Sequence, residues 1–202
     1  RDWSSDVCSS DLCVAVTTEF ENVPAASLSH LAQHAFVAPG ASAVSVAQDR
    51  LVEKNFFTQC AQSSGVAPAP HHAITTLADI DGIPEHLFPA ILKTARLGYD
   101  GKGQVRVRSR ADVSAAFAQM QQVPCVLEQM LPLAYEISVL AVRGADGQAV
   151  GYPIAENVHR DGILFSTTVP GPNVSADCAA RAQAATLEII NRLDYEIGRA
   201  HV

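Results

Sequence analysis

The 202-residue chain lacks the features that mark membrane, nucleic-acid-binding and disulfide-stabilised proteins. It has no apolar run of the about 20 residues that a membrane-spanning helix needs. Its net charge is −7, without a cluster of basic residues, which argues against nucleic-acid binding. Its five cysteines are scattered and have no ligand spacing, which argues against a disulfide framework and a zinc site. These absences predict a protein of a reducing cytoplasm, without membrane or nucleic-acid partners.

The chain does have enough apolar sequence for a folded core. Hydrophobic residues make up 48% of it and charged residues 17%, as in soluble globular proteins. Its length allows one sizeable core, or one domain with part of a second. Strand and helix patterns are mixed without a repeat, which predicts the end of an α/β unit followed by an α+β region. We place the boundary between the two near residues 66–70.

The two ends of the chain are related at the level of their coding. The DNA string GACGTGTGCTCTTCCGAT encodes residues 6–11, and its reverse complement, ATCGGAAGAGCACACGTC, encodes residues 197–202. One DNA sequence read in opposite directions can therefore produce both ends, and this string resembles a common sequencing adapter. We expect residues 1–12 and 196–202 not to be native protein, which leaves residues 13–195.

Hydrophobic periodicity and turn residues predict the order of helices and strands. Asp49 is the expected N-cap of a helix that Gly65 ends. The predicted strands are 13–18 (buried), 73–76, 88–93, 104–108, 125–130, 136–142, 149–154 and 163–168, with 136–142 and 149–154 forming a hairpin. The predicted helices are 24–34, 41–47, 49–63, one from about residue 77, 110–122 and 175–193.

The last predicted helix has an apolar face that the sequence gives no obvious means of covering. This face consists of Ala182, Ala185, Ile189 and Leu193, and no further strand follows against which it could pack. We therefore expect this face to lie in water, which favours aggregation or a molten second domain.

The stretch from Lys93 to Gln104 is the most informative part of the sequence. Its lysine ends an apolar run, and three glycines, Gly98, Gly101 and Gly103, follow within a few residues. A glycine-rich loop at a hairpin tip can place backbone N–H groups and ammonium groups against a polyphosphate. A dipeptide such as Asp-Gly between two strands is equally a strong hairpin-turn signal that needs no ligand. The residues alone leave both interpretations open.

The order of motifs along the chain resembles the 5-(carboxyamino)imidazole ribonucleotide synthases, which are ATP-grasp ligases of purine biosynthesis. The likeness covers residues 13–195. It rests on Glu19-Phe-Glu-Asn-Val-Pro24, Gln48-Asp-Arg50, Lys54, Ile-Leu-Lys93, Gly98-Tyr-Asp-Gly-Lys-Gly-Gln104, Leu-Glu-Gln-Met-Leu131, Glu136 and Asn157-Val-His-Arg-Asp-Gly-Ile-Leu164. The resemblance implies the end of a pre-ATP-grasp α/β domain over residues 13–65 and a truncated ATP-grasp domain over residues 66–195.

The resemblance also implies which residues bind ATP. Arg50 and Lys93 match cations that contact the nucleotide, Glu136 matches the acid that binds the ribose hydroxyls, and His159 matches a further position of the site. The loop from Gly98 to Gln104 matches a lid over the triphosphate, and the strand around Glu128 matches the one whose backbone meets the adenine. The full implied set is Arg50, Lys93, Gly98, Tyr99, Asp100, Gly101, Lys102, Gly103, Gln104, Glu128, Gln129, Met130, Leu131, Glu136 and His159, with Tyr99, Asp100 and Lys102 as candidate catalytic residues.

Without the resemblance, several of these residues have simpler interpretations. Arg50 at a helix start, and Glu128 and Glu136 in strands, are by type most often solvated charges. His159, beside a glycine, is by spacing alone a turn residue. The assignment of these four residues therefore depends on the family and not on their spacing.

The implied parent is an ATP-dependent carbon–nitrogen ligase. It uses ATP to activate bicarbonate as carboxyphosphate and then carboxylates aminoimidazole ribonucleotide, and it is implied to be a homodimer. Mg²⁺ is an implied cofactor whose ligands lie beyond the end of this sequence, so we expect this chain to be inactive by itself. Two alternatives remain: another ATP-grasp carboxylase or amide-forming ligase, and a non-catalytic nucleotide-binding module.

Overall fold

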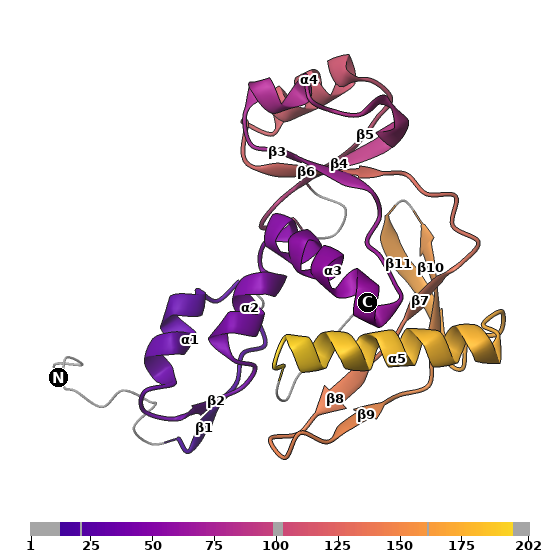
Figure 1. Ribbon diagram of the computed structural model, residues 1–202. Helices are drawn as coiled ribbons and strands as arrows, with labels where there is room; N and C mark the ends of the chain where they lie inside the picture. The colour runs from indigo at the N-terminus through magenta and orange to yellow at the C-terminus, as the bar shows by residue number, and fades with distance from the viewer. Residues whose placement is uncertain (1–12, 21, 99–102, 161, 196–202) are drawn as a thin grey trace, which may run out of the picture.

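A computed structural model describes residues 13–20, 22–98, 103–160 and 162–195 (Figure 1). The expectations about residues 1–12, 99–102 and 196–202 lie outside the described residues. No helix in the described ranges is long and apolar enough to cross a membrane. Mixed helices and sheets confirm the expected fold class, with a small N-terminal α/β portion followed by an α+β region.

The N-terminal portion consists of two short parallel strands and three helices. Strand β1 (Ala15–Val16) pairs with β2 (Phe36–Val37). Helix α1 (Ala25–Leu31) follows β1 along the chain, and helix α2 (Ala41–Ala47) follows β2. The prediction of a buried strand over residues 13–18 is wrong, because only two of these residues are in the strand and most of the segment is exposed. Within the described residues β1 pairs with β2 alone, so little of its surface leaves water.

Helix α3 (Arg50–Ser64) has the ends that the sequence predicts. The Asp49 carboxylate accepts hydrogen bonds from the N–H groups of Leu51 and Val52, at 2.9 and 3.4 Å. These bonds satisfy backbone donors that have no partner within the helix. Gly65 ends the helix in the left-handed region, at φ 70°, where a residue without Cβ is favoured.

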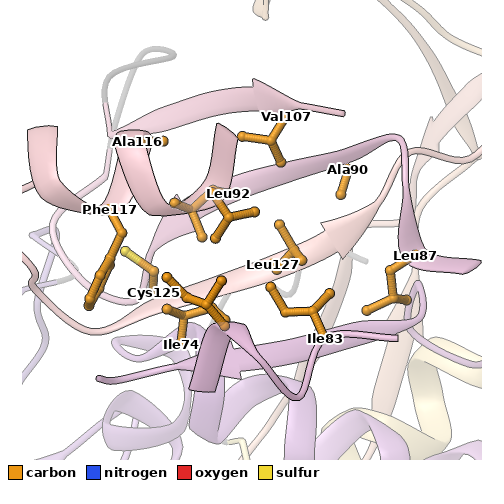
Figure 2. Close-up of a cluster of buried hydrophobic side chains, with 12 residues drawn as sticks. Ile74, Ile83, Leu87, Ala90, Leu92, Val107, Ala116, Phe117, Cys125 and Leu127 are labelled. Carbon is orange, nitrogen blue, oxygen red and sulfur yellow. The ribbon is translucent and has the colours of Figure 1, made fainter. Parts of the chain in front are cut away.

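A four-stranded antiparallel sheet forms the next layer, in the order β3 (His71–Ile74), β6 (Cys125–Gln129), β4 (Ala90–Thr94), β5 (Gln104–Val107). Helix α4 (Arg110–Gln119) covers one face of it, as Figure 1 shows. Side chains from both layers form a buried core, drawn in Figure 2. This core includes Ile74, Leu92, Val107, Phe117 and Leu127.

The helix predicted from residue 77 is a single 3₁₀ turn, η2 (Leu77–Ile80), and a second turn, η3 (Glu85–Leu87), follows it. The Asp79 carboxylate accepts from the N–H groups of Thr75 and Thr76, at 2.8 and 2.7 Å, which fixes the start of the turn. Pro84 then follows within a few residues, and proline cannot continue a helix interior. The local bonds therefore favour a tight turn over a longer helix.

The second half of the chain holds a three-stranded sheet in the order β11 (Ile163–Thr168), β10 (Ala155–Arg160), β7 (Glu136–Ser138). A separate hairpin joins β8 (Ala141–Arg143) to β9 (Ala149–Gly151). The turn of this hairpin is as predicted, but the single strand predicted over residues 136–142 is wrong. Its first part pairs with β10 and its last part with β9, so the chain changes sheets between them.

Helix α5 (Ala176–Arg192) packs against α3, β8 and β9, as Figure 1 shows for the yellow helix beside α3. Ala185 is 1% exposed and Ile189 is 3% exposed. The Arg192 guanidinium also donates to the Gln59 carbonyl of α3, at 3.0 Å. The expectation that this apolar face lies in water is therefore wrong, because α3 covers it together with the β8–β9 hairpin.

Candidate nucleotide-binding site

The face of the four-stranded sheet opposite α4 carries charged side chains. Successive side chains of a strand point to opposite faces, so Leu92 and Leu127 lie in the core while Lys93 and Glu128 point away from it. Helix α3 contacts β6, and Figure 1 shows it on the side of the sheet away from α4. The candidate site therefore begins where α3 meets this sheet.

Three side chains from three elements form an ion cluster at this junction. Oε2 of Glu128, on β6, lies 2.9 Å from Lys93 Nζ on β4 and 3.3 Å from Lys54 Nζ on α3. The side chains of Glu128 and Lys54 are 11% and 13% exposed, and that of Lys93 is 26% exposed. Burial by itself raises the pKa of Glu128, but the charges and hydrogen bonds of Lys93 and Lys54 hold the pKa below its ordinary value of 4.5. The carboxylate is thus ionised and shared by two ammonium groups.

Glu53, beside Lys54 on α3, is a second acid near this cluster. Burial raises its pKa above the ordinary value of 4.5, while the charges of Lys54 and Arg50 act in the opposite direction. The junction therefore brings together two acids and three cations, the third being Lys93. With every group ionised, the net charge of these five side chains is +1, which suits an anionic ligand.

Arg50 holds the segment that leads into the glycine loop. Its guanidinium donates to the carbonyls of Thr94 and Gly98, at 2.8 and 3.3 Å. Its backbone N–H donates to the Ala95 carbonyl, at 2.9 Å. The expected nucleotide contact of Arg50 remains a prediction, but its position beside the loop is now defined.

The glycines at both ends of the loop are closely packed against neighbouring side chains. A Cβ on Gly98 would lie 2.9 Å from Arg50 Nη1, and one on Gly103 would lie 2.7 Å from Thr94 Oγ1. Gly103 also has φ +74°, and its carbonyl accepts from the Thr94 N–H at 2.8 Å. The antiparallel pairing of β4 with β5 confirms the predicted hairpin. The roles of Tyr99, Asp100, Gly101 and Lys102 stay predictions, because these residues lie outside the described ones.

The segment after β6 offers an apolar surface and part of a backbone edge. The N–H groups of Gln129 and Met130 donate to the carbonyls of Pro70 and Pro89, both at 2.9 Å. The N–H of Leu131 has no such partner within the described residues. Met130 and Leu131 are 37% and 44% exposed. Of the N–H groups expected to meet an adenine, that of Leu131 thus has no backbone partner in the described ranges, and the two exposed side chains are apolar.

The three-stranded sheet adds the remaining expected residues. Nδ1 of His159 on β10 lies 2.5 Å from Oε2 of Glu136 on β7. These strands are paired, with Glu136 opposite Asn157, and His159 lies two residues further along β10. The β10–β11 turn reaches the glycine hairpin, because a Cβ on Gly162 would lie 3.0 Å from Gln104 Nε2. Both sheets thus border the same region.

Lys54 is the residue of this cluster to which sequence reasoning assigned no role. Its spacing of four residues from Arg50 on α3 is the signal that could have identified it, because residues i and i+4 lie on one side of a helix.

Among the described residues, no group of three or more His, Cys, Asp and Glu side chains could hold a metal ion. The magnesium ligands expected beyond the end of this sequence remain a prediction.

Comparison with protein-family models shows the family to which this chain belongs. The model of the ATP-grasp domain matches residues 59–198, and the model of the ribonucleotide synthetase preATP-grasp domain matches residues 7–48. Because the first match covers more than half of the chain, the chain belongs to the ATP-grasp family.

Within this family, the similar curated proteins are N5-carboxyaminoimidazole ribonucleotide synthases. The chain is 39% identical to the N5-carboxyaminoimidazole ribonucleotide synthase of Brucella melitensis, over 89% of this chain and 49% of the relative. It is 40% identical to the synthase of Pseudomonas aeruginosa, over 89% and 48%. The chain therefore spans about half the length of the curated relatives that it matches.

Solved structures give the same result. The synthetase from Staphylococcus aureus in complex with ADP has a TM-score of 0.78 at 36% identity, over 89% of this chain and 46% of that one. The synthetase from Thermus thermophilus has a TM-score of 0.80 at 33% identity, over 94% and 53%. The resemblance inferred from the motifs is confirmed.

Proposed function

We propose that this chain carries the ATP-binding part of a ligase that carboxylates 5-aminoimidazole ribonucleotide with bicarbonate. The observation that carries the proposal is the junction of α3 with β4 and β6, where Lys93, Lys54 and Arg50 gather at the base of the β4–β5 hairpin. Clustered cations and backbone N–H groups are what a polyphosphate requires in a site that excludes water. The names of the relatives supply the substrate.

Each part of ATP has a place in this arrangement. The triphosphate lies against Lys93 and the glycine hairpin, and the adenine lies on Met130 and Leu131 with its edge toward the Leu131 N–H. The ribose hydroxyls donate to Glu136, whose carboxylate His159 holds in position. The solved synthetase that is described as an ADP complex is consistent with nucleotide binding by this fold.

The proposed chemistry has two steps. A bicarbonate oxygen attacks the γ-phosphorus of ATP, which gives carboxyphosphate and ADP. The amine of aminoimidazole ribonucleotide then attacks the carboxyl carbon. The N–C bond forms, the C–O bond to the phosphorus-bound oxygen breaks, and phosphate leaves with the proton that the amine loses. The cations of this chain hold the phosphates in place, and the hairpin keeps water from the acyl phosphate.

Other expectations about the whole protein are also proposals. The parent enzyme is a homodimer in the cytoplasm, uses Mg²⁺, and takes its magnesium ligands from outside the described residues. The four cysteines in the described ranges are free, consistent with a reducing compartment. Without those magnesium ligands, binding of ATP rather than turnover is the expected activity of this chain.

Calorimetric titration of the purified chain with ATP, ADP and AMP tests the binding proposal. We expect ATP and ADP to bind more tightly than AMP, because the cations contact the outer phosphates. K93Q should weaken ATP binding and leave AMP binding nearly unchanged, whereas R181A, on an exposed part of α5, should change neither. Equal affinity for all three nucleotides would contradict the proposed site.

A second experiment tests the substrate in the full-length parent. Bicarbonate-dependent ATP hydrolysis is measured with and without aminoimidazole ribonucleotide. We expect the ribonucleotide to stimulate phosphate release and to be carboxylated. Hydrolysis that another amine or acid stimulates instead would favour a different ATP-grasp carboxylase or an amide-forming ligase.

A further inference from the structure

Lys54 is placed so that it can act on Lys93 through a shared carboxylate. Both ammonium groups approach the same oxygen, Oε2 of Glu128, at 3.3 Å and 2.9 Å. Lys54 is the more buried of the two, with 13% of its side chain exposed against 26% for Lys93. Lys93 is therefore the ammonium that can turn toward a ligand, and Lys54 is the one that stays.

The composition of the chain indicates that the ammonium group matters here. The chain has three lysines, Lys54, Lys93 and Lys102, and eleven arginines. All three lysines belong to the junction or to the glycine loop. A lysine ammonium is a compact charge that can share one carboxylate oxygen with a second ammonium, whereas a guanidinium is a planar group suited to bidentate pairing.

We propose that Lys54 is a positioning residue that neutralises Glu128 and so allows Lys93 to leave that carboxylate for the phosphates of the nucleotide. This inference rests on the proposed ATP site. When a phosphate approaches, it competes with Glu128 for the Lys93 ammonium. With Lys54 in place, the carboxylate that Lys93 leaves still has a partner, so the exchange does not strand a buried charge.

Without Lys54 the exchange becomes unfavourable. Glu128 is 9% exposed, and an ionised carboxylate at that depth needs a charged partner. Lys93 would then be the remaining ammonium on Glu128, and binding phosphate would leave the carboxylate unpaired. Glu53, whose burial already disfavours its charged form, would lose its neighbouring cation as well. The expected loss is therefore specific to ligands that draw on Lys93.

A double-mutant cycle of K54Q, E128Q and K54Q/E128Q, read by calorimetric titration with ATP and AMP, tests this coupling. We expect K54Q to weaken ATP binding by about tenfold, the size of one lost hydrogen bond to a charged group, and to affect AMP little. In the E128Q background the same substitution should have almost no effect, because no carboxylate then holds Lys93. K54R should recover part of the affinity.

The matched control is R143Q, which removes a similarly buried cation, 16% exposed, from the ion pair with Asp194. It should leave ATP affinity unchanged. A thermal melt of each variant shows whether it remains folded. If K54Q binds ATP like the unmodified chain, or weakens it equally in the E128Q background, Lys54 does not act through Glu128 and the inference is wrong.

A ligand-free measurement separates this inference from the proposed function. Reductive methylation with ¹³C labels the lysines without removing their charge, and three side chains give a simple NMR spectrum. We expect the Lys93 signal to move in K54Q and to return toward its original position in K54Q/E128Q. If the unmodified chain does not bind ATP, the proposed function is wrong, and an unmoved Lys93 signal independently overturns the coupling.

Discussion

The substitution of Ile189 by alanine tests whether helix α5 is part of the cooperative fold. Ile189 is 3% exposed and lies on the face of α5 that packs against α3, β8 and β9. Replacing a buried isoleucine by alanine removes three carbon atoms and leaves a cavity, which costs about 3 kcal/mol of the free energy of unfolding. That cost is a large part of the stability of an ordinary domain.

The loss is measured by urea unfolding followed by circular dichroism at the helix band. With a slope of about 2 kcal/mol per molar urea, a loss of about 3 kcal/mol lowers the midpoint by roughly 1.5 M. The control is R181A on the same helix, where the arginine side chain is 72% exposed. Its effect should stay within about 0.5 kcal/mol.

A midpoint for I189A equal to that of the unmodified chain would contradict the burial of this face. In that case α5 would not be packed against α3 in solution, and its backbone amides should exchange with solvent as fast as those of an unfolded segment. A large loss in R181A as well would show that the helix is sensitive to any substitution, not that this face is buried.

Further predictions concern the loop, the ion cluster and a helix end. G103A should destabilise the chain by about 1–2 kcal/mol and weaken ATP binding, because alanine would have to adopt a left-handed φ and its Cβ would contact Thr94. Thermal melts measure the loss of stability, and calorimetric titration measures the loss of ATP affinity. The folded protein lowers the pKa of Glu128, so this carboxylate stabilises the fold above its unfolded pKa of about 4.5. That stability is lost as the pH falls through the lower folded pKa. E128Q should therefore lose less stability than the unmodified chain in acid denaturation. The folded protein raises the pKa of Glu53, so its protonated form gives stability at low pH that is lost as the pH rises through the folded pKa. E53Q should therefore be more stable than the unmodified chain at neutral pH and lose this advantage in acid. D49A should cost about 1 kcal/mol in urea unfolding through the lost N-cap of α3, whereas D49N should retain most of it.

The sequence predicts those features that local residues determine. The cap of α3 by Asp49, its end at Gly65 and the β4–β5 hairpin follow from residues close to each other along the chain. Helix α2 and strand β11 have the predicted bounds. Their patterns are short-range, so they do not depend on what packs against them.

The features that the sequence misses depend on contacts between distant segments. The break between β7 and β8 follows from pairing with β10 and β9, which lie further along the chain. The covered face of α5 follows from α3, and Arg192 contacts a residue 133 positions away. Lys54 likewise becomes meaningful only when α3 lies beside β6. Periodicity shows that a face is apolar or charged, but it does not show which element meets that face.

The position of Arg50 explains why the glycine loop and helix α3 form one unit. A guanidinium has five N–H donors in a fixed plane. Arg50 uses donors on both terminal nitrogens for the carbonyls of Thr94 and Gly98, and other donors remain for a ligand. A Cβ on Gly98 would lie 2.9 Å from this guanidinium, so a larger residue there would displace Arg50. The same contact therefore joins the start of the hairpin to helix α3, which also carries Lys54 four residues further along, so we expect the proposed nucleotide binding at the loop to depend on the orientation of α3.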